Sequence, residues 1–481
     1  MPHAAPPPRI LLPLIVACAL FMEQVDATVI VTALPAIARD LHEDPVALKL
    51  ALTSYLLSLA VFIPVSGWVA DRYGARTVFR AAIVIFTLGS ILCGFSTSLT
   101  DFVLYRIVQG LGGALMVPVG RLVILRSVPK SDLVSALAWL TVPALMGPVL
   151  GPPLGGFITT YFDWRLIFFI NVPIGILGVF LATRFIDDVR AETVPPLDLR
   201  GLILVGLGLC GTVFGLGMAG QPLMPAWVAF GALGIGIAAL AGYGVHARRT
   251  AQPVIDLGLL RYPTFRAGVL GGSLFRTGIG ALPFLLPLML QLVFGLTPFA
   301  SGVLTFFASV GAIAMKFAAA PILRRGGYRG VLVANAFACA GFIAVNALFT
   351  PLTPHWMISM LLLVGGFLRS LQFTALNALS YAEVTHEEMS RATAFASVAQ
   401  QVSLSVGVAL AGFVLEFVRI ERADASLTQA DFAYAFVVVA LVGLGSVFFF
   451  LPLSRDAGSE LIAPRARETI PDPRGDVHTP S

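Results

Sequence analysis

The chain has 481 residues, of which 57% are hydrophobic and 12% are charged, against about 25% charged residues in a typical soluble domain. This composition excludes a water-soluble globular protein, because so apolar a surface needs lipid around it. The net charge of +5 does not indicate a nucleic-acid partner, because the basic residues fall in short segments between apolar runs.

Apolar runs of about 20 residues recur from Ile10 to Leu453, and each can cross a hydrocarbon core about 30 Å thick. Before them, residues 1–9 carry no convincing cleavage site, so we expect the first run to be retained. The sequence predicts an all-α polytopic membrane protein with fourteen spans, at residues 10–34, 46–69, 79–99, 102–125, 134–159, 166–186, 200–219, 226–246, 264–291, 299–322, 331–350, 356–379, 393–417 and 432–453.

The basic residues predict the orientation of the chain. With the N-terminus inside, 22 of the 31 Lys and Arg residues fall in or beside inner segments. Five fall in or beside outer segments (Arg39, Lys49, Arg165, Arg419 and Arg422), and four lie deep within spans (Arg106, Arg276, Lys316 and Arg369). Because positive charge is retained on the cytoplasmic side, we expect both termini to be cytoplasmic in a bacterial inner membrane. Residues 454–481 are polar and rich in proline, which predicts a disordered cytoplasmic tail.

Two pairs of similar segments predict an internal repeat. The segment 67–76 resembles 320–329, and Arg106-x-x-Gln109 resembles Arg369-x-x-Gln372. Both pairs fit parallel halves at residues 10–190 and 251–453, with two additional spans at 191–250. Repeated halves that meet at a midplane site are a transporter architecture.

Charged residues inside spans are costly and usually line a polar path. Glu23 and Asp26 are three residues apart in the first span, so they share a helix face and should titrate as a coupled pair. Arg106 in the fourth span needs a partner, for which these acids are candidates. We interpret all three as proton-coupling residues, against the alternative of an inert salt bridge or clamp.

Further polar residues in the spans predict a substrate cavity. Arg276 lies in mid-span, whereas Lys316 could instead reach the membrane surface. Three cations in the second half favour an anionic or zwitterionic substrate as readily as a cationic drug. The predicted cavity residues are Tyr55, Gln109, Arg276, Gln291, Lys316, Arg369, Gln372, Asn377 and Gln400.

Three motifs resemble signatures of the major facilitator superfamily. They are Gly67-x-x-x-Asp71-Arg72-Tyr73-Gly74-x-Arg76 after the second span, Arg106-x-x-Gln109-Gly110-x-Gly112-Gly113 in the fourth and Gly147-x-x-x-Gly151-Pro152-x-x-Gly155-Gly156 in the fifth. Two further segments, from Asp26 to Pro35 and from Trp164 to Gly175, resemble its fourteen-span drug:proton antiporter family, the EmrB/QacA type. Within that family, residues 117–122 and Met315-Lys316 are most similar to the MdtD/HsrA branch.

The resemblance implies the major facilitator fold, with two six-helix bundles and two extra helices between them. It marks the fourth-span motif as proton-linked and the fifth-span motif as typical of antiporters. The segment 67–76 would be a gating loop, in which Asp71 and Arg72 help to latch the outward-facing state. The EmrB type works with a periplasmic adaptor, but the chain shows no recognisable adaptor surface, and we expect a monomer.

Several function classes remain to be weighed. An enzyme is not expected, because none of the six histidines lies in mid-span and no P-loop is present. Without ATP, metal or another cofactor, the proton gradient would supply the energy. The favoured hypothesis is proton-coupled export of small amphipathic compounds by alternating access. The alternatives are export of an organic anion or metal chelate, and a non-transporting membrane receptor or structural protein.

Overall fold

The computed structural model describes residues 11–128, 133–187, 194, 196–218, 225–385, 387–422 and 426–461. For residues 11, 125–127, 133–145 and 226 it describes the backbone alone. Within these ranges every regular element is a helix. The predicted N-terminal segment 1–9 and most of the predicted tail lie outside the described residues.

The first half and the two additional helices are built from long, nearly uninterrupted helices. They are α1 (Leu11–Asp40), α2 (Lys49–Tyr73), α3 (Ala75–Gly94), α4 (Leu99–Ser127), α5 (Leu133–Tyr161), α6 (Leu166–Phe169) continued by α7 (Asn171–Phe185), α8 (Leu199–Met218) and α9 (Ala226–Ala247).

The second half begins with a more irregular span, in which two π-helical turns separate short α-helices. Its elements are η1 (Leu257–Arg261), α10 (Pro263–Arg266), η2 (Ala267–Gly271), α11 (Gly272–Gly280), α12 (Leu282–Leu288), η3 (Met289–Val293), α13 (Pro298–Gly326), α14 (Tyr328–Val345), η4 (Asn346–Leu348), α15 (His355–Ser380), α16 (Met389–Arg422), α17 (Gln429–Leu444), α18 (Val447–Phe450) and η5 (Ser459–Leu461).

Thirteen helical segments of the described chain are long and apolar enough to cross a membrane. The remaining predicted span corresponds to α5, a helix of 29 residues that packs along α1. All fourteen predicted spans are therefore helices in the structure. Several extend beyond the predicted ends, as α1 does to Asp40.

The turns after α2 and α13 explain why the two halves look alike in sequence. Gly74 (φ 93°) joins α2 to α3, and Gly327 (φ 63°) joins α13 to α14. Only glycine adopts such angles without strain. The prediction of a loop over residues 67–76 is wrong, because 67–73 complete α2 and Arg76 lies in α3. A single glycine makes the turn.

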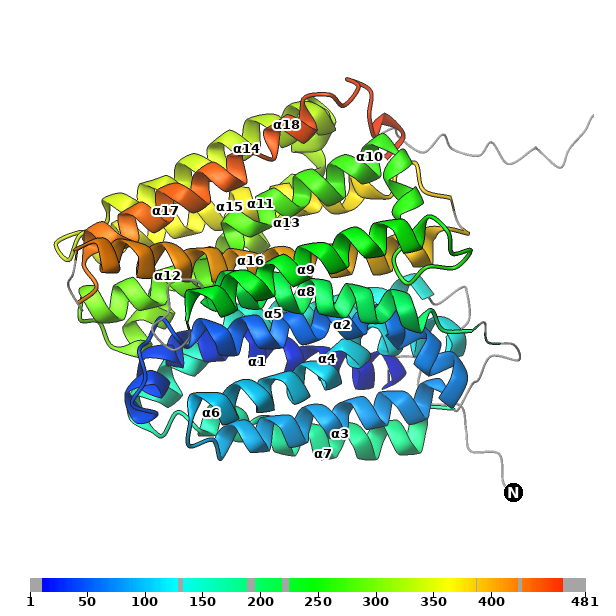
Figure 1. Ribbon diagram of the computed structural model, residues 1–481, viewed down its shortest axis with the longest axis horizontal. Helices are drawn as coiled ribbons and strands as arrows, with labels where there is room; N and C mark the ends of the chain where they lie inside the picture. Colours follow the sequence, from blue (N-terminus) through cyan, green and yellow to red (C-terminus); the bar gives the residue numbers. More distant parts are fainter. Residues whose placement is uncertain are drawn as a thin grey trace, which may run out of the picture.

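The helices form two bundles that lie side by side with roughly parallel axes (Figure 1). The bundles meet where α5 packs on α13 and α2 packs on α16. Helix α8 packs against both α2 and α16, and α9 lies on α8. The additional pair thus covers one of the two seams between the halves.

Candidate functional site

A buried ion pair lies in the core of the first half. Arg106 Nη1 on α4 lies 2.6 Å from Asp26 Oδ2 on α1, and both side chains are 1% exposed. The predicted partner of Arg106 is therefore Asp26 rather than Glu23. Two opposite charges so far from water are tolerated only when they are paired and hydrogen-bonded.

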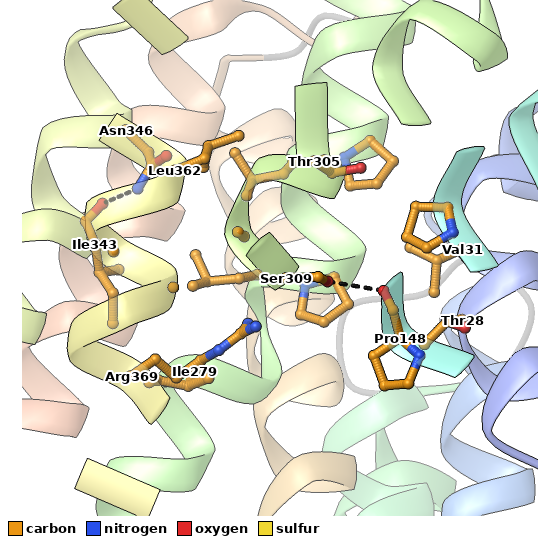
Figure 2. Close-up of a pocket in the computed structure, with 18 of the residues that line it drawn as sticks. Thr28, Val31, Pro148, Ile279, Thr305, Ser309, Ile343, Asn346, Leu362 and Arg369 are labelled. Atoms are coloured by element: carbon orange, nitrogen blue, oxygen red, sulfur yellow. Dashed lines mark hydrogen bonds between the residues drawn. The ribbon is translucent and has the colours of Figure 1, made fainter. Parts of the chain in front are cut away.

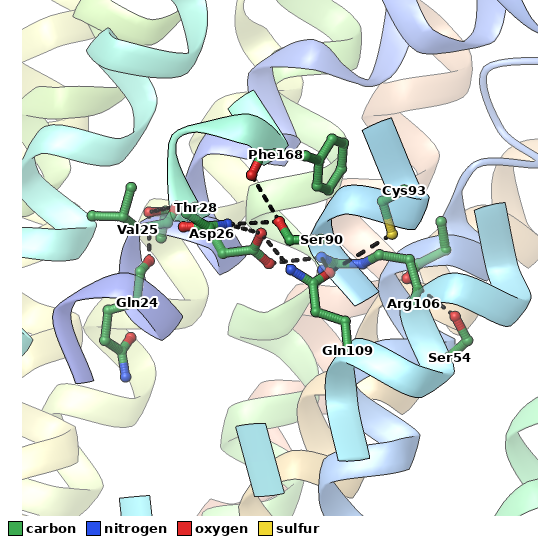
Figure 3. Close-up of polar contacts among 12 residues, drawn as sticks. Gln24, Val25, Asp26, Thr28, Ser54, Ser90, Cys93, Arg106, Gln109 and Phe168 are labelled. Carbon is green, nitrogen blue, oxygen red and sulfur yellow. Dashed lines mark hydrogen bonds and ion pairs between the residues drawn. The ribbon is translucent and has the colours of Figure 1, made fainter. Parts of the chain in front are cut away.

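Amide side chains complete the surroundings of Asp26 (Figure 3). Gln109 Nε2 donates to Asp26 Oδ1 at 2.8 Å, and Gln109 Oε1 accepts from Arg106 at 2.6 Å. Asn171 Nδ2 on α7 also donates to Asp26 Oδ1, at 3.0 Å, and to Ser90 Oγ at 2.9 Å. Asp26 thus joins α1, α4 and α7, so a change in its charge alters the contacts among three helices.

Tyr55 and Glu23 lie beside this network. The Arg106 guanidinium carbon lies 4.3 Å from the centre of the Tyr55 ring, a cation–π geometry. A Cβ added to Gly113 would lie 3.1 Å from the Tyr55 hydroxyl and 3.8 Å from the carboxyl carbon of Glu23. Tyr55 Oη and Glu23 Oε2 are buried, and no described residue forms a hydrogen bond with either atom. Glu23 therefore lies near the pair but is not part of it.

A cavity of about 630 Å³ lies between the two halves. Arg106 and Tyr55 border it from the first half, and Asp26 lies behind Arg106. Helices α11, α13, α15 and α16 supply the opposite wall, with Lys316, Arg369, Asn377 and Gln400 as its amide or cationic residues. The volume is that of a site for a drug-sized molecule.

A second cavity of about 200 Å³ shares a wall with the first. Its lining is mostly apolar, and the polar exceptions are Thr28, Thr32, Thr305, Ser309, Asn346 and Arg369. Figure 2 shows Arg369 and Ile279 on one side and Pro148 and Thr28 on the other. Ser309 Oγ donates to Pro148 O at 2.7 Å across the halves.

The three cations within the spans of the second half, Arg276, Lys316 and Arg369, have no acidic partner in the part of the chain that is described. Arg369 lines both cavities, and no described residue forms a hydrogen bond or ion pair with it. Lys316 Nζ donates to Thr374 at 3.1 Å. Arg276 is 3% exposed and its contact with Asn377 Oδ1 is long, 3.4 Å. The spans of the second half therefore carry three positive charges that no described acid compensates.

Of the nine predicted cavity residues, five line the larger cavity: Tyr55, Lys316, Arg369, Asn377 and Gln400. The others lie behind its wall. Gln109 binds Asp26, Gln291 donates to Thr32 O at 2.9 Å, and Gln372 donates to Leu332 O at 3.1 Å. Arg276 lies against Phe373, 5.6 Å from the ring centre. Span position alone does not tell which helix face a polar residue occupies.

The glycines of the fifth-span motif lie where α5 meets two other helices. A Cβ on Gly147, Gly151 or Gly155 would collide with α1, and one on Gly156 would collide with Pro298 and Phe299 at the start of α13. Likewise, a Cβ on Gly302 of α13 would collide with the backbone carbonyl of Pro152 in α5. The motif thus allows the backbones of the two halves to approach closely.

The motif at residues 67–76 lies where α2 ends and α3 begins. Arg72 is exposed, and Arg76 Nη1 donates to Ile186 O, just after α7, at 3.4 Å. Asp71 is half-buried and has an interaction partner of its own. The predicted role of this segment in gating stays a prediction.

Contacts between the halves cluster at the opposite end, where α1 gives way to α2. Phe299 N donates to Thr160 Oγ1 at 3.0 Å, and Ser405 Oγ donates to Thr53 O at 3.3 Å. With the contact from Gln291 to Thr32, these hydrogen bonds join the two halves on that side. No described group of three His, Cys, Asp or Glu residues is placed to hold a metal ion.

The sequence profile of the Major Facilitator Superfamily matches residues 16–408 and, in a second alignment, 268–476. The chain belongs to the major facilitator superfamily. This membership confirms the prediction of a transporter rather than an enzyme, and it gives no support to the non-transporting alternative. The all-helical fold, with two six-helix bundles and two extra helices, is also confirmed.

Two relatives from enterobacteria lie within this superfamily. MdtD of Pectobacterium atrosepticum is 36% identical over 438 residues, which cover 90% of this chain and 94% of MdtD. MdtD of Salmonella typhimurium is 34% identical over 461 residues, 95% and 97% of the two chains. Both names assign those proteins, provisionally, to multidrug resistance. The predicted likeness to the MdtD branch is therefore confirmed.

Two solved superfamily structures are similar in fold. A POT family peptide transporter superposes with a TM-score of 0.67 at 15% identity, over 92% of this chain and 97% of its own. A D-xylose-proton symporter superposes with a TM-score of 0.65 at 15% identity, over 93% and 98%.

Three polar residues of the site are not among the residues predicted from the sequence. Asn171 and Ser90 support Asp26, and Ser309 links the two halves. One signal could have identified Asn171, because it is the only asparagine before residue 335. Ser90 and Ser309 carry no such signal, since serines are common in the spans.

Proposed function

We propose that this superfamily member exports small amphipathic compounds in exchange for protons, by alternating access. The observation that carries the proposal is that Arg106 lines the cavity while it is paired with Asp26, which is not among the residues that line it. The names of the MdtD relatives support a drug-like substrate. Lipid and protons would be the other partners, and a monomer with no adaptor would suffice.

The ion pair can couple a proton to the cavity. A proton on Asp26 would cancel the charge that holds Arg106, leaving a buried cation without compensation. Breaking such a pair costs roughly 3–5 kcal/mol, so a conformation that rehydrates Arg106 would then be favoured. Deprotonation on the other side of the membrane would restore the pair. Proton binding to Asp26 would thus favour one orientation of the cavity, and that orientation would in turn favour the protonated form of Asp26.

The direction of transport follows from topology. The distribution of Lys and Arg supports cytoplasmic termini in the inner membrane. The end of the bundle where α1 gives way to α2 is then the outer end. Since the contacts between the halves cluster there, the cavity would be closed outside and would receive its cargo from the cytoplasmic side.

The test uses the full chain in proteoliposomes with a pH gradient, with ethidium as the transported dye. We expect Asp26→Asn to abolish gradient-driven dye movement and dye-induced proton flux, because asparagine cannot exchange a proton. Asp163→Asn, in an exposed outer turn, is the matched control and should behave as the wild type. Unchanged transport by Asp26→Asn would refute Asp26 as the proton carrier.

A second candidate function is export of an organic anion or metal chelate. The observation in its favour is Arg369, a cation at the wall of both cavities with no described partner. We then expect the wild type to move carboxyfluorescein, and Arg369→Gln to lose this transport at least about tenfold while Arg325→Gln, an exposed control, retains it. A wild type that moves ethidium but never the anionic dye would refute this candidate.

A further inference from the structure

Four charged side chains join the two halves at the outer end. Asp44 precedes α2 and Lys49 begins it, whereas Glu416 and Arg419 lie near the end of α16. Arg419 Nη1 donates to Asp44, and Arg419 Nη2 donates to Glu416 Oε2 at 2.5 Å. Arg419 therefore binds an acid from each half at once.

Lys49 is the most unusual member of this cluster. It is 0% exposed, and none of the residues that the structure describes forms a hydrogen bond with its ammonium. The side chain packs on Gly412 of α16, where an added Cβ would lie 3.0 Å from Nζ. Because Gly412 and Glu416 are four residues apart, Lys49 lies on the helix face that carries Glu416. A buried ammonium requires such a negative neighbour.

The four charges balance, and the neighbouring elements add none that would disturb the balance. Arg422 is paired with Asp431 of α17 at 2.7 Å. His42 and Glu421 are exposed, and Glu43 is half-buried in the turn before α2. The described outer end of α8 and all of α12 carry no charged residue. The cluster therefore has two acids, Asp44 and Glu416, for two cations.

The loss of one acid would change the force between the halves. If Glu416 takes up a proton, Lys49 and Arg419 share Asp44 alone. Two cations with one acid in a poorly hydrated site repel one another more strongly than they would in water. Since Lys49 belongs to the first half and Arg419 to the second, this repulsion acts to separate the outer ends of α2 and α16.

We propose that Asp44, Lys49, Glu416 and Arg419 form an outer gate that opens when Glu416 receives a proton from the outside. The gate rests on the alternating access proposed above and adds to it a second proton-responsive site, distinct from Asp26. It would admit external protons to the cavity only after one proton has bound at its rim.

The gate is tested by measuring a distance rather than transport. Spin labels are placed on Thr97→Cys and Leu352→Cys, in exposed outer turns of the two halves, after the four native cysteines are replaced. Electron–electron distances are recorded for the full chain in lipid nanodiscs at pH 7.5 and pH 5. We expect the wild type to have a short distance at pH 7.5 and to gain a longer one at pH 5.

Two variants should shift the gate in opposite directions. Glu416→Gln mimics the protonated acid, so its long-distance population at pH 7.5 should exceed that of the wild type by at least about tenfold. Lys49→Gln removes the repelling cation, so the distance should stay short at pH 5. Glu421→Gln, an exposed glutamate on the same helix, is the matched control and should follow the wild type.

The proposal is overturned if either Glu416→Gln or Lys49→Gln keeps the wild-type distances at both pH values. Should Glu416→Gln fail to fold, Lys49→Gln decides alone, because a wild-type pH response in that variant is sufficient to refute the gate. Dye export in liposomes is measured in parallel. Wild-type export with an unresponsive gate would refute only the gate, and a responsive gate without export would refute only the proposed function.

Discussion

Arg106 and Arg369 occupy matching positions of the Arg-x-x-Gln repeat, yet their surroundings differ. Arg106 is bound to Asp26, whereas Arg369 has no described partner. The glutamines differ in the same way: Gln109 donates to Asp26, but Gln372 donates to Leu332 O and accepts from Asn335 at 2.8 Å. No described carboxylate contacts Arg369 or Gln372, so at the level of this repeat we expect the first half to bind the coupled proton.

This asymmetry predicts different outcomes for two matched variants. Gln109 and Gln372 are both 0% exposed, so truncating either to alanine should lower the free energy of unfolding by about 1–3 kcal/mol. Only Gln109→Ala should also lower dye-driven proton flux, because only Gln109 binds Asp26. Thermal unfolding and proton flux are measured on the same samples. Equal losses of flux in the two variants would contradict the assignment of coupling to the first half.

Among the helices, α5 contacts both α1 and α13 through small residues. Each glycine of its motif faces a backbone or a short side chain, as Gly156 faces Pro298 and Phe299. Two glycines of α9 differ, since a Cβ on Gly231 or Gly234 would meet nothing within 4 Å. The need for glycine is therefore steric in α5 and absent at these positions of α9.

Adding one methyl group tests this difference. Gly156→Ala should lower stability by roughly 1–3 kcal/mol through overpacking between the halves. Gly231→Ala should leave stability unchanged or raise it by up to about 1 kcal/mol, because alanine favours helix. Thermal unfolding in detergent compares the two with the wild type. A Gly156→Ala protein as stable as Gly231→Ala would show that the close approach of α5 and α13 can relax.

The sequence allowed the helices to be predicted better than their contacts. Runs of about 20 apolar residues leave no other regular structure in lipid, so all fourteen spans were found. The segment 67–76 was taken for a loop because charges cluster there, although Asp71 and Arg72 fit the last turn of a helix. The pairing of Arg106 with an acid could be predicted from the cost of a buried charge. The positions of Gln109, Gln291 and Gln372 could not, because they depend on helix rotation.

For the whole molecule, the prediction of two halves with an inserted pair left open where that pair would lie. The structure has α8 against α2 and α16, a contact between residues far apart in sequence. The outer cluster was missed for the same reason, since Lys49 and Arg419 were each counted as outer loop charges. Their burial arises only when the halves meet.

The inserted pair is anchored by Asp198 at the end where α8 begins and α9 finishes. This carboxylate accepts from Gly201 N at 2.9 Å at the start of α8 and from His246 Nε2 of α9 at 2.8 Å. Burial opposes ionisation, but the Gly201 and His246 hydrogen bonds outweigh it and hold the pKa of Asp198 below its usual value. Val254 N adds a contact at 3.4 Å from the segment that leads to the second half. Asp198 therefore ties α8, α9 and this segment together.

The lowered pKa fixes the sign of the pH dependence. A carboxyl that ionises more readily in the folded protein stabilises it above the unfolded pKa, about 3.9 for Asp, and loses this contribution as pH falls through the folded pKa. We expect Asp198→Asn to speed amide hydrogen exchange in residues 243–255 on the order of tenfold at pH 7, and to remove the further rise that acidification below about pH 4 causes in the wild type. Glu460→Gln, an exposed control, should leave both unchanged. An Asp198→Asn protein that keeps the wild-type pH profile would show that the pair is anchored by packing on α2 and α16 alone.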